Sequence, residues 1–416
     1  MSYILALNAG SAGLKYQIYN ADTKAFIVGG NVQKIGLPDS YNDQKYADDR
    51  PKEHRDQKCD NHAQALDLVI SMLQSGGINL SDISAAGHRV VHGGEKFKNS
   101  VEITDEVIKE LEALLPLAPL HNPPILACIM AAKQLIPSAA QVAVFDTAFH
   151  QTMPDYANRY AVPKSWYTDL GVRRYGFHGT SHLYVSKRVA LQLGKPADQC
   201  NMIIMHIGSG ASACAIKNGI SVDTSLGMTP IPGLMMGSRC GDLDPAVPFY
   251  VKEQLGLSDA EVLDILNKKS GFRGVTVHWQ DLRDVIERMD AEPDCKLALE
   301  MEAYRIKQYI GNYMAVLGRV DAIAFTAGVG ENNPVLRAMM TSGLEELGII
   351  LDPVRNDAAK VMDNGSGDSE ISADNSKIKV FMIPTDEERV IVEDTIAIAN
   401  GTYNSDHLQM EYSFIN

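Results

Sequence analysis

The chain has 416 residues, of which 45% are hydrophobic and 22% are charged, a composition typical of folded globular proteins and unlike that of disordered or fibrous chains. Its length is sufficient for two or three domains, each with a core of its own. The 38 basic and 52 acidic residues give a net charge of −14, which disfavours nucleic acid and anionic membranes as partners. These values favour a soluble cytoplasmic enzyme.

Targeting and membrane signals are absent from the sequence. Residues 1–8 lack a basic region and a long apolar core, so no signal peptide is predicted. No stretch approaches the ~18 apolar residues of a transmembrane helix. The six cysteines are far apart and form no CxxC pair, which predicts reduced thiols in a cytoplasm and no disulfide framework or zinc site.

Short apolar runs alternate with helical spacing from end to end, which predicts an α/β chain with a mixed or parallel sheet. The expected strands are Ile4–Asn8, Lys15–Tyr19, Val142–Phe145, Met202–His206, Ala211–Ile216, Ala322–Thr326 and Lys379–Ile383. The expected helices are Asn61–Leu73, Asp105–Leu115, Leu183–Leu193, one that begins near Pro334, and Glu388–Ala399. Surface insertions are expected at Gly36–Gln57 and Asp363–Ser376, and the last fifteen or so residues are expected to form a loosely held tail.

Two glycine-rich turns between strands repeat one pattern about half a chain apart. Leu7–Gly13 and Met205–Ala211 both carry a polar residue shortly before a Gly-Ser pair and return on a second strand. This repeat predicts a duplicated domain with two phosphate-binding turns that face each other across a cleft. A third turn, Gly328–Asn332, follows a strand and opens a helix, where a nucleotide's phosphates or sugar would bind.

The common nucleotide and nucleophile motifs do not fit. The sequence contains neither GxxxxGK[ST] nor GxSxG, which excludes a P-loop and disfavours an α/β-hydrolase serine. Gly208–Ala213 matches the loose pattern GxGxxA, but a hairpin follows it where a dinucleotide site needs a helix.

Many polar side chains lie near the predicted strand ends and glycine turns. Taken singly, each has a structural interpretation: Arg89 can form an ion pair, Asp146 can cap a helix, and His206 can be a core histidine. Together, arginines, carboxylates and glycine turns are typical of phosphoryl transfer, in which the protein positions groups and neutralises charge. The set comprises His88, Arg89, His92, His121, Asp146, His150, Arg174, His178, His182, His206, Arg239, Asp242 and Asp244.

These segments, in this order, resemble the acetate kinase family, the short-chain acyl kinases of the acetate and sugar kinase/Hsp70/actin superfamily. The resemblance covers nearly the whole chain. It is carried by Asn8–Tyr16, Gly87–Gly94, Ala118–Asn122, Val144–His150, Arg174–His182, Met235–Pro245, Phe325–Asn332 and Ile383–Glu388.

The resemblance implies the reaction ATP + acetate ⇌ ADP + acetyl phosphate, with Mg²⁺ or Mn²⁺, in a cytoplasmic homodimer that binds neither nucleic acid nor a membrane. It also implies two duplicated actin-like (ribonuclease H-like) α/β domains with an interdomain active-site cleft. The first would span residues 1–150 and about 389–416, closed by the carboxy-terminal helix. The second, residues 151–388, would carry most of the nucleotide site and the dimer interface.

The resemblance also implies roles for individual residues. The implied catalytic set is Arg89, Asp146, His178 and Arg239, with the two arginines gripping acetate and the transferred phosphoryl group. Asn8 and Glu387 are implied at the metal, and His121 near the substrate. The pocket for the acetate methyl would contain Val91, Leu120, Phe177 and Pro230. The implied nucleotide contacts are Lys15, His206, Gly208, Ser209, Gly210, Asp281, Leu282, Arg283, Gly328, Val329, Gly330 and Asn332.

Four segments depart from the family pattern, and they leave the phosphoryl donor open. The first hairpin has Ser11, Ala12 and Gly13 where three serines are usual, and the second has Ser209 in place of an asparagine. The segment Val277–Gln280 replaces small and serine residues, and Ala327 replaces a glycine. ATP, pyrophosphate or another donor therefore remains possible.

Three functions stay open: an acetate kinase, a kinase for propionate or butyrate, and a nucleotide-binding regulatory protein without turnover. One methylene in an apolar pocket is worth only about 1–3 kcal/mol, so the sequence does not separate the acyl chains. For a kinase we expect direct in-line transfer, because a carboxylate needs no general base. A phosphoenzyme at Glu387 is the alternative.

Overall fold

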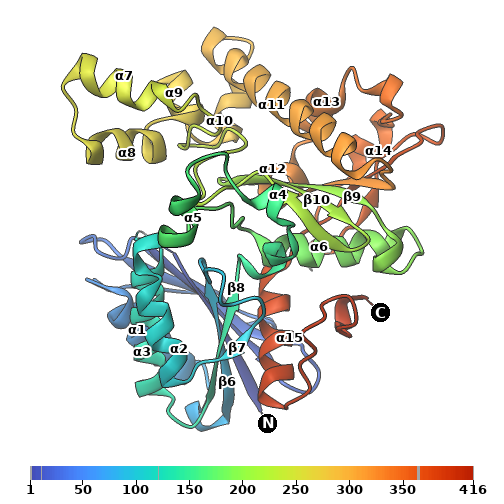
Figure 1. Cartoon of the computed structure of the whole chain (residues 1–416). Helices are drawn as coiled ribbons and strands as arrows, with labels where there is room; N and C mark the ends of the chain where they lie inside the picture. Colours follow the sequence, from blue (N-terminus) through green and yellow to red (C-terminus); the bar gives the residue numbers. More distant parts are fainter. Residues whose placement is uncertain (1, 11, 120, 363–365, 416) are drawn as a thin grey trace. The chain divides into compact units, whose positions relative to one another are not determined.

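The computed structural model describes residues 2–10, 12–119, 121–362 and 366–415. The chain folds into two compact units (Figure 1). Unit 1 consists of Met1–Gln151 and Asp386–Asn416, and unit 2 consists of Thr152–Thr385. Both are built from α-helices and a mixed β-sheet, which confirms the predicted α/β class.

Unit 1 contains an eight-stranded sheet in its described residues, in the order β5-β4-β3-β2-β1-β6-β8-β7. Strands β1, β6 and β8 are parallel neighbours, whereas β1 to β5 form an antiparallel meander. Its strands are β1 (Tyr3–Ala9), β2 (Gly13–Asn20), β3 (Phe26–Gln33), β4 (Tyr41–Tyr46), β5 (Glu53–Asp56), β6 (Ile83–Val90), β7 (Val101–Glu102) and β8 (Ala140–Phe145). Its helices are α1 (His62–Ser75), α2 (Asp105–Ala113), α3 (Asn122–Leu135) and α15 (Glu387–Ala399).

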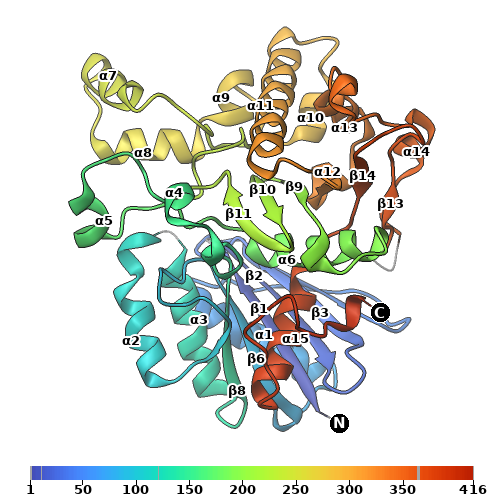
Figure 2. The same ribbon diagram turned by 45° about the vertical axis from the view of Figure 1, so that its right-hand side comes forward.

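Helices cover both faces of this sheet (Figures 1 and 2). Helix α15 packs on β1, β6 and β8, and α1 and α3 cover the opposite face. Ile391 and Val392 of α15 share a buried core with Ile4 and Val142 of the sheet. The close approach of α15 requires Gly87, because a Cβ atom there would lie 2.2 Å from the Thr395 hydroxyl.

Unit 2 contains a six-stranded sheet in its described residues, in the order β11-β10-β9-β12-β14-β13 (Figure 2). Its strands are β9 (Met202–Ile207), β10 (Ala211–Lys217), β11 (Ile220–Thr224), β12 (Ala322–Thr326), β13 (Ser369–Glu370) and β14 (Lys379–Met382). Its helices are α4 (Asp155–Asn158), α5 (Lys164–Leu170), α6 (Gly179–Gln192), α7 (Ala246–Leu255), α8 (Asp259–Lys268), α9 (Gly271–Thr276), α10 (Leu282–Glu287), α11 (Pro293–Leu317), α12 (Ala327–Asn332), α13 (Pro334–Thr341) and α14 (Pro353–Ala358). Helix α6 lies on one sheet face and α11 on the other.

The two sheets repeat one topology. The order β3-β2-β1-β6-β8 in unit 1 corresponds to β11-β10-β9-β12-β14 in unit 2, an antiparallel meander followed by two parallel strands. Each sheet also ends in a short antiparallel edge strand, β7 or β13. The repeated topology supports the duplication that the two similar hairpins indicate.

The segment Gly36–Gln57 was predicted to be a surface insertion, and this is wrong. It contributes β4 and β5 to the sheet of unit 1. In β4 the side chains that point inward include Asn42 and Gln44, which are buried and bonded to the Tyr16 hydroxyl at 2.8 and 2.6 Å. Polar residues therefore occupy the core face, and the apolar alternation that marks a strand is absent.

Three other segments differ from their sequence predictions. The carboxy-terminal tail is anchored: Tyr412 is fully buried, and its hydroxyl donates to the Asp394 carboxylate at 2.9 Å. The turn predicted at Gly328–Asn332 is part of α12. The predicted insertion Asp363–Ser376 contributes β13 to the sheet, and residues 363–365 of it lie outside the described residues.

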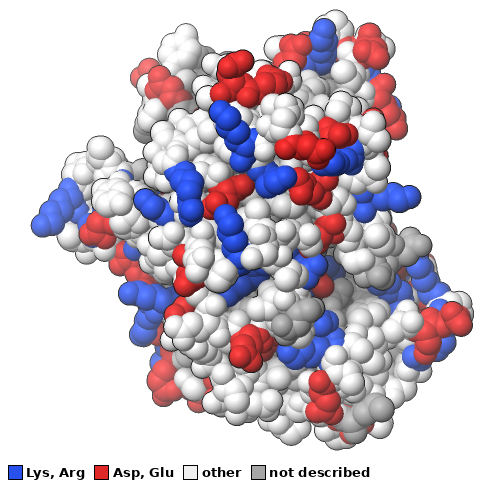
Figure 3. All heavy atoms as spheres, turned by 90° about the vertical axis from the view of Figure 1, so that its right-hand side faces the viewer, with Lys and Arg blue, Asp and Glu red and all other residues white. Residues whose placement is uncertain are grey.

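Basic and acidic side chains are interspersed on the face of the molecule shown in Figure 3. This face therefore presents no extended surface of a single sign. Among the helices in the described part of the chain, none combines the length and the apolar character needed to cross a membrane.

Candidate active site

In unit 1, polar side chains gather where three parallel strands end. Asn8 lies near the end of β1, Arg89 near the end of β6, and Asp146 directly after β8. Arg89 lies opposite Val144 in the register of β6 and β8. Because the carboxyl ends of parallel strands meet at the same sheet edge, the topology brings these three side chains together.

Arg89 is held by two oxygen-bearing partners. Its Nε and Nη2 donate to the two carboxylate oxygens of Asp146 at 2.9 and 2.6 Å, and its Nη1 donates to Asn8 Oδ1 at 3.1 Å. The Asp146 side chain is 1% exposed. Burial alone would lower the pKa of Arg89, but the charges of Asp146 and Glu387 outweigh it and raise the pKa above its ordinary value. Arg89 is therefore a fixed cation.

The first hairpin contributes a second ion pair. Lys15 lies opposite Asn8 across β1 and β2, and its Nζ contacts the Glu388 carboxylate at 2.5 Å. Glu387 precedes Glu388 in the first turn of α15 and is partly buried. Ser11, the remaining serine of the hairpin, lies outside the described residues.

Unit 1 contains two of the residues predicted around the acetate methyl, Val91 and Leu120, and also His121, which was predicted near the substrate. Val91 is buried. His121 is partly buried at the start of α3. Leu120 lies outside the described residues.

In unit 2, His178, Gly210 and Arg239 lie together. His178 begins α6 with a left-handed backbone, φ 57°. A Cβ atom on Gly210, in the turn between β9 and β10, would lie 3.5 Å from His178 Nε2 and 3.6 Å from Arg239 Nη1. Glycine therefore leaves the backbone of this turn directly exposed to an imidazole and a guanidinium, which are both suited to anions.

Hydrogen bonds fix the His178 ring from behind. Its Nδ1 lies 2.9 Å from the Ser212 hydroxyl, which also contacts His182 Nε2 at 2.8 Å. The ring stacks on His206, with centroids 4.2 Å apart. His206 Nδ1 in turn lies 2.8 Å from the Ser181 hydroxyl. The imidazole of His178 is therefore oriented with Nε2 toward Gly210.

Arg239 belongs to residues 230–244, which we call the arginine loop. Its Nη1 donates to the Pro230 carbonyl at 3.1 Å and contacts the Met236 sulfur at 3.6 Å. In the described part of the chain it has no carboxylate partner, and burial lowers its pKa from the ordinary value. Pro230 is partly buried, and Phe177, which precedes His178, is buried.

A pocket of about 650 Å³ lies beside this glycine turn. Eight of the predicted nucleotide contacts line it: Gly208, Ser209, Asp281, Leu282, Arg283, Gly328, Val329 and Asn332. The sequence missed Gly237, Ser238, Gln280, Ile286 and Asn333, which also line it. The other four predicted contacts, Lys15, His206, Gly210 and Gly330, are not among the lining residues. A pocket of this volume suits a small-molecule ligand.

Two of the missed residues, Gly237 and Gln280, reach the pocket because their backbones lie close together. No sequence motif marks such an approach. A Cβ atom on Gly237 would lie 3.0 Å from the Gln280 carbonyl oxygen, so glycine permits two loops to meet at the pocket wall. Next to Gln280, Trp279 Nε1 donates to Glu292 at 2.9 Å, and the Arg288 guanidinium lies over its ring. Trp279 therefore packs against the protein, whereas Val277 of the same segment is 68% exposed.

The opposite end of the pocket is formed by α12. Asn332 Nδ2 donates to the Gly328 carbonyl at 2.8 Å. Glu331 accepts from the Thr385 backbone N–H at 2.9 Å, and burial raises its pKa. Ala327 begins the helix with a positive φ of 64°, a conformation that glycine adopts without strain.

Comparisons with known proteins agree with this arrangement. The acetokinase family model matches residues 3–393. The chain is 51% identical to the acetate kinase of Trichlorobacter lovleyi over 416 residues, which cover 99% of this chain and 98% of that protein. The crystal structure of Porphyromonas gingivalis acetate kinase has a TM-score of 0.89 at 43% identity and covers 96% of this chain and all of that one.

A propionate kinase from Francisella tularensis has a TM-score of 0.87 at 36% identity, over 94% of this chain and 98% of that one. The fold is thus the actin-like α/β fold of these kinases. On the family match, the sequence identity and the shared fold, the chain belongs to the acetokinase family, phosphotransferases that use a carboxyl group as acceptor.

Proposed function

We propose that the protein transfers the γ-phosphoryl group of ATP to acetate, reversibly, giving ADP and acetyl phosphate. The observation that carries the proposal is the placement of His178 Nε2 and Arg239 Nη1 around the backbone of Gly210, beside the pocket of unit 2. Two cationic or hydrogen-bond-donating groups aimed at one glycine turn suit a transferring phosphoryl group.

ATP is the proposed donor. The pocket combines glycine turns at Gly208 and Gly328 with the apolar side chains of Leu282 and Ile286. Glycine backbone suits phosphates and apolar side chains suit a base. Pyrophosphate would use the glycine turns, but it would leave the apolar side chains of Leu282 and Ile286 without a role. The predicted contacts His206, Gly210 and Gly330 belong to the same proposed site, because each lies within two residues of a lining residue in the sequence.

Acetate is the proposed acceptor. Arg89 and Arg239 bind its carboxylate and the transferring group, because a planar guanidinium matches both carboxylate and phosphate. Asp146 fixes the guanidinium of Arg89 by its two-oxygen contact. The proposed contacts of the acetate methyl among the described residues are Val91, Phe177 and Pro230, and His121 is the residue proposed to border the acceptor.

The proposed mechanism is a single in-line displacement. A carboxylate oxygen of acetate attacks the γ-phosphorus as the bond to the leaving oxygen of ADP breaks, and no proton has to move because acetate is already ionised at neutral pH. Arg239 and His178 offset the charge on the phosphoryl oxygens. For Nε2 of neutral His178 to donate, its Nδ1 accepts from the Ser212 hydroxyl, which in turn accepts from His182 Nε2.

The residues at the end of β1 and the start of α15 fit a magnesium ion. Among the described residues no cluster of three or more His, Cys, Asp or Glu side chains could hold a metal ion. Mg²⁺ usually keeps several waters and binds one or two protein oxygens together with substrate phosphates. Asn8 and Glu387 supply such oxygens and would hold Mg²⁺, or Mn²⁺ in its place. When bound, the ion neutralises charge on the phosphates of ATP.

Trapping of acyl phosphate with hydroxylamine tests the proposal. Purified protein with Mg²⁺ receives acetate or propionate, each with ATP or with pyrophosphate. Hydroxamate from acetate and ATP supports it, and a higher kcat/KM with propionate would reassign the acceptor. Product with pyrophosphate alone would reassign the donor. No product in any arm from folded protein would contradict a kinase and favour a nucleotide-binding protein without turnover.

The alternative to one displacement is a phosphoenzyme at Glu387. Transfer from ATP that is chiral at the γ-phosphorus separates the two. A single displacement inverts the configuration, whereas two displacements through Glu387 retain it. Retention would contradict the in-line mechanism.

We also propose a homodimer in the cytoplasm. Unit 2 exposes large apolar side chains on α7, with Phe249, Tyr250 and Leu255 between 65% and 72% exposed. Such a surface supports self-association through unit 2. All six cysteines are free thiols, which supports a reducing compartment. Sedimentation at two protein concentrations tests the dimer, and a monomer at both would contradict it.

A further inference from the structure

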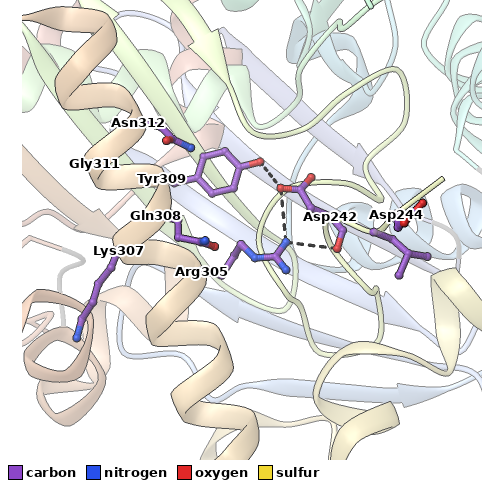
Figure 4. Close-up of a pocket in the computed structure, with 9 residues that line it drawn as sticks. Asp242, Asp244, Arg305, Lys307, Gln308, Tyr309, Gly311 and Asn312 are labelled. Carbon is purple, nitrogen blue, oxygen red and sulfur yellow. Dashed lines mark hydrogen bonds and ion pairs between the residues drawn. The ribbon is translucent and has the colours of Figure 1, made fainter. Parts of the chain in front are cut away.

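Helix α11 presents three polar side chains to the arginine loop. Glu302, Arg305 and Tyr309 follow one another at intervals of three and four residues, so they share one face of the helix. Burial raises the pKa of the Glu302 carboxyl, and the nearby Met235 backbone N–H lowers it by a smaller amount. Arg305 and Tyr309 contact Asp242, at the other end of the loop (Figure 4).

Asp242 closes the neck of the arginine loop. Its backbone N–H donates to the Gly233 carbonyl at 2.9 Å, and its Oδ1 accepts from the Gly233 N–H at 2.8 Å. Arg239 lies between these two residues in the sequence. The Tyr309 hydroxyl donates to the other carboxylate oxygen of Asp242 at 2.7 Å. One carboxylate therefore joins both ends of the loop to α11.

The side chain of Arg305 binds the backbone of the same neck. Its Nη1 donates to the carbonyl oxygens of Gly233 and Asp242 at 3.3 and 3.4 Å and lies 3.5 Å from the Asp242 carboxylate (Figure 4). These contacts leave the loop little freedom to shift along α11.

The backbone of the arginine loop is tightly packed. Gly241 has a positive φ of 71°, and a Cβ atom there would lie 2.7 Å from the carbonyl oxygens of Gly233 and Leu234. Gly271 also has a positive φ, and a Cβ atom on it would lie 2.0 Å from the Met236 carbonyl oxygen. Because the backbone is packed this closely, a shift at the neck moves Arg239 with it.

We propose that Tyr309 and Arg305 are positioning residues that hold the arginine loop so that the Arg239 guanidinium stays beside His178 Nε2 and Gly210. They touch neither substrate nor the reacting atoms and act through Arg239. The inference rests on the proposed role of Arg239 in phosphoryl transfer. An arginine without a carboxylate partner has no ion pair to fix its position, and α11 supplies the constraint through the backbone.

The first test is Tyr309→Phe, which removes one hydroxyl and keeps the ring. We expect kcat to fall about 5- to 30-fold, because a small displacement of a catalytic cation is costly. KM for ATP should rise by less than kcat falls, because Gly237 and Ser238 are the two residues of the arginine loop that line the nucleotide pocket, and its other lining residues lie outside the loop. Tyr304→Phe is the control on the same helix: this tyrosine is 65% exposed and should leave kcat unchanged.

A second control separates positioning from loss of a buried hydroxyl. Tyr313 also lies on α11 and is 2% exposed, and its hydroxyl has no hydrogen-bond partner in the described part of the chain. Tyr313→Phe should keep kcat within about twofold. A fall in kcat as large as that of Tyr309→Phe would overturn the inference, because it would trace the loss to helix packing.

The decisive test is a double-mutant cycle with Arg239→Ala. If Tyr309 acts through Arg239, Tyr309→Phe lowers the residual kcat of Arg239→Ala by less than about twofold. Equal fold-losses in both backgrounds would overturn the inference. Arg305→Gln, measured in the same way, replaces Tyr309→Phe if that variant does not fold.

The outcomes distinguish the inference from the function on which it rests. A wild-type rate in Arg239→Ala would contradict the proposed role of Arg239 itself. An inactive Arg239→Ala together with a wild-type rate in both Tyr309→Phe and Arg305→Gln would overturn only the positioning by α11.

Discussion

Arg89 in unit 1 and Arg239 in unit 2 are held in opposite ways. Arg89 is fixed by its side chain, which makes a two-oxygen contact with Asp146 and a third bond to Asn8. Arg239 has no carboxylate partner among the described residues and bonds only to a carbonyl and a sulfur. Its position comes from the backbone of the arginine loop.

The two arginines therefore differ in charge compensation. A carboxylate offsets the charge of Arg89, and none among the described residues offsets that of Arg239. Asp146 repays the cost of burying Arg89, and the pKa of this arginine is raised. Burial lowers the pKa of Arg239, because no negative charge among the described residues offsets it. An arginine of this second kind gains its charge partner when an anion binds, so it is suited to the group that moves.

The largest expected effect is that of Arg239→Ala on turnover. We expect kcat to fall by about 10³-fold or more, the range for an arginine that stabilises phosphoryl transfer. Stability should hardly change, because the substitution breaks one hydrogen bond and relieves an uncompensated buried charge. Steady-state rates and urea unfolding measure the two. A destabilised variant would show that Arg239 is part of the structural frame.

Arg89→Ala should instead lower activity and stability together. It removes the guanidinium that contacts both oxygens of the buried Asp146 carboxylate, which costs about 3–5 kcal/mol of unfolding free energy. The measurement is urea unfolding at pH 7. The double variant Arg89→Ala, Asp146→Asn should recover most of the stability and none of the activity. If it stayed as unstable as the single variant, the ion pair would not be the cause.

A pH dependence of stability is expected from Glu302. Burial raises its pKa from 4.5 to about 8. The folded protein therefore holds a proton that the unfolded chain releases, and stability falls as the pH rises from about 4.5 to 8. Glu302→Gln should flatten this fall in urea unfolding at pH 5 and pH 8. An unchanged slope would exclude Glu302 as its source.

The smallest expected effect is that of Ala327→Gly, which tests backbone positioning in unit 2. The alanine holds a positive φ of 64°, and glycine removes that strain at some cost in chain entropy. We expect the unfolding free energy to rise by up to about 1 kcal/mol. Urea unfolding measures it. A loss of stability would mean that packing of the buried methyl outweighs the strain.

Strand ends and glycine turns could be predicted from the sequence because they depend on local residue types. Asn8 ends the predicted strand Ile4–Asn8 and Asp146 follows the predicted strand Val142–Phe145, whereas the strand that carries Arg89, β6, was not predicted. The hairpin at Asn218-Gly219 is also local, since both residues have the positive φ that a tight turn needs.

The remaining features depend on contacts that residue types do not reveal. Strand β4 was missed because Asn42 and Gln44 face the core and bond to Tyr16. The tail was predicted to be loose, but one buried tyrosine, Tyr412, anchors it through Asp394. The residue types of the tail do not reveal this contact. Gly237 and Gln280 meet at the pocket through a close backbone approach, which has no sequence signature.

The most direct test is ATP formation from acetyl phosphate and ADP, followed by luminescence. It compares the wild type, the single variant Arg239→Ala, and the double variant that carries both Arg89→Ala and Asp146→Asn. The account predicts saturable ATP formation by the wild type and a loss of at least about 10³-fold in both variants, with Arg239→Ala as stable as the wild type. A folded wild-type protein that forms no ATP, or an Arg239→Ala variant that forms it at the wild-type rate, would contradict the account.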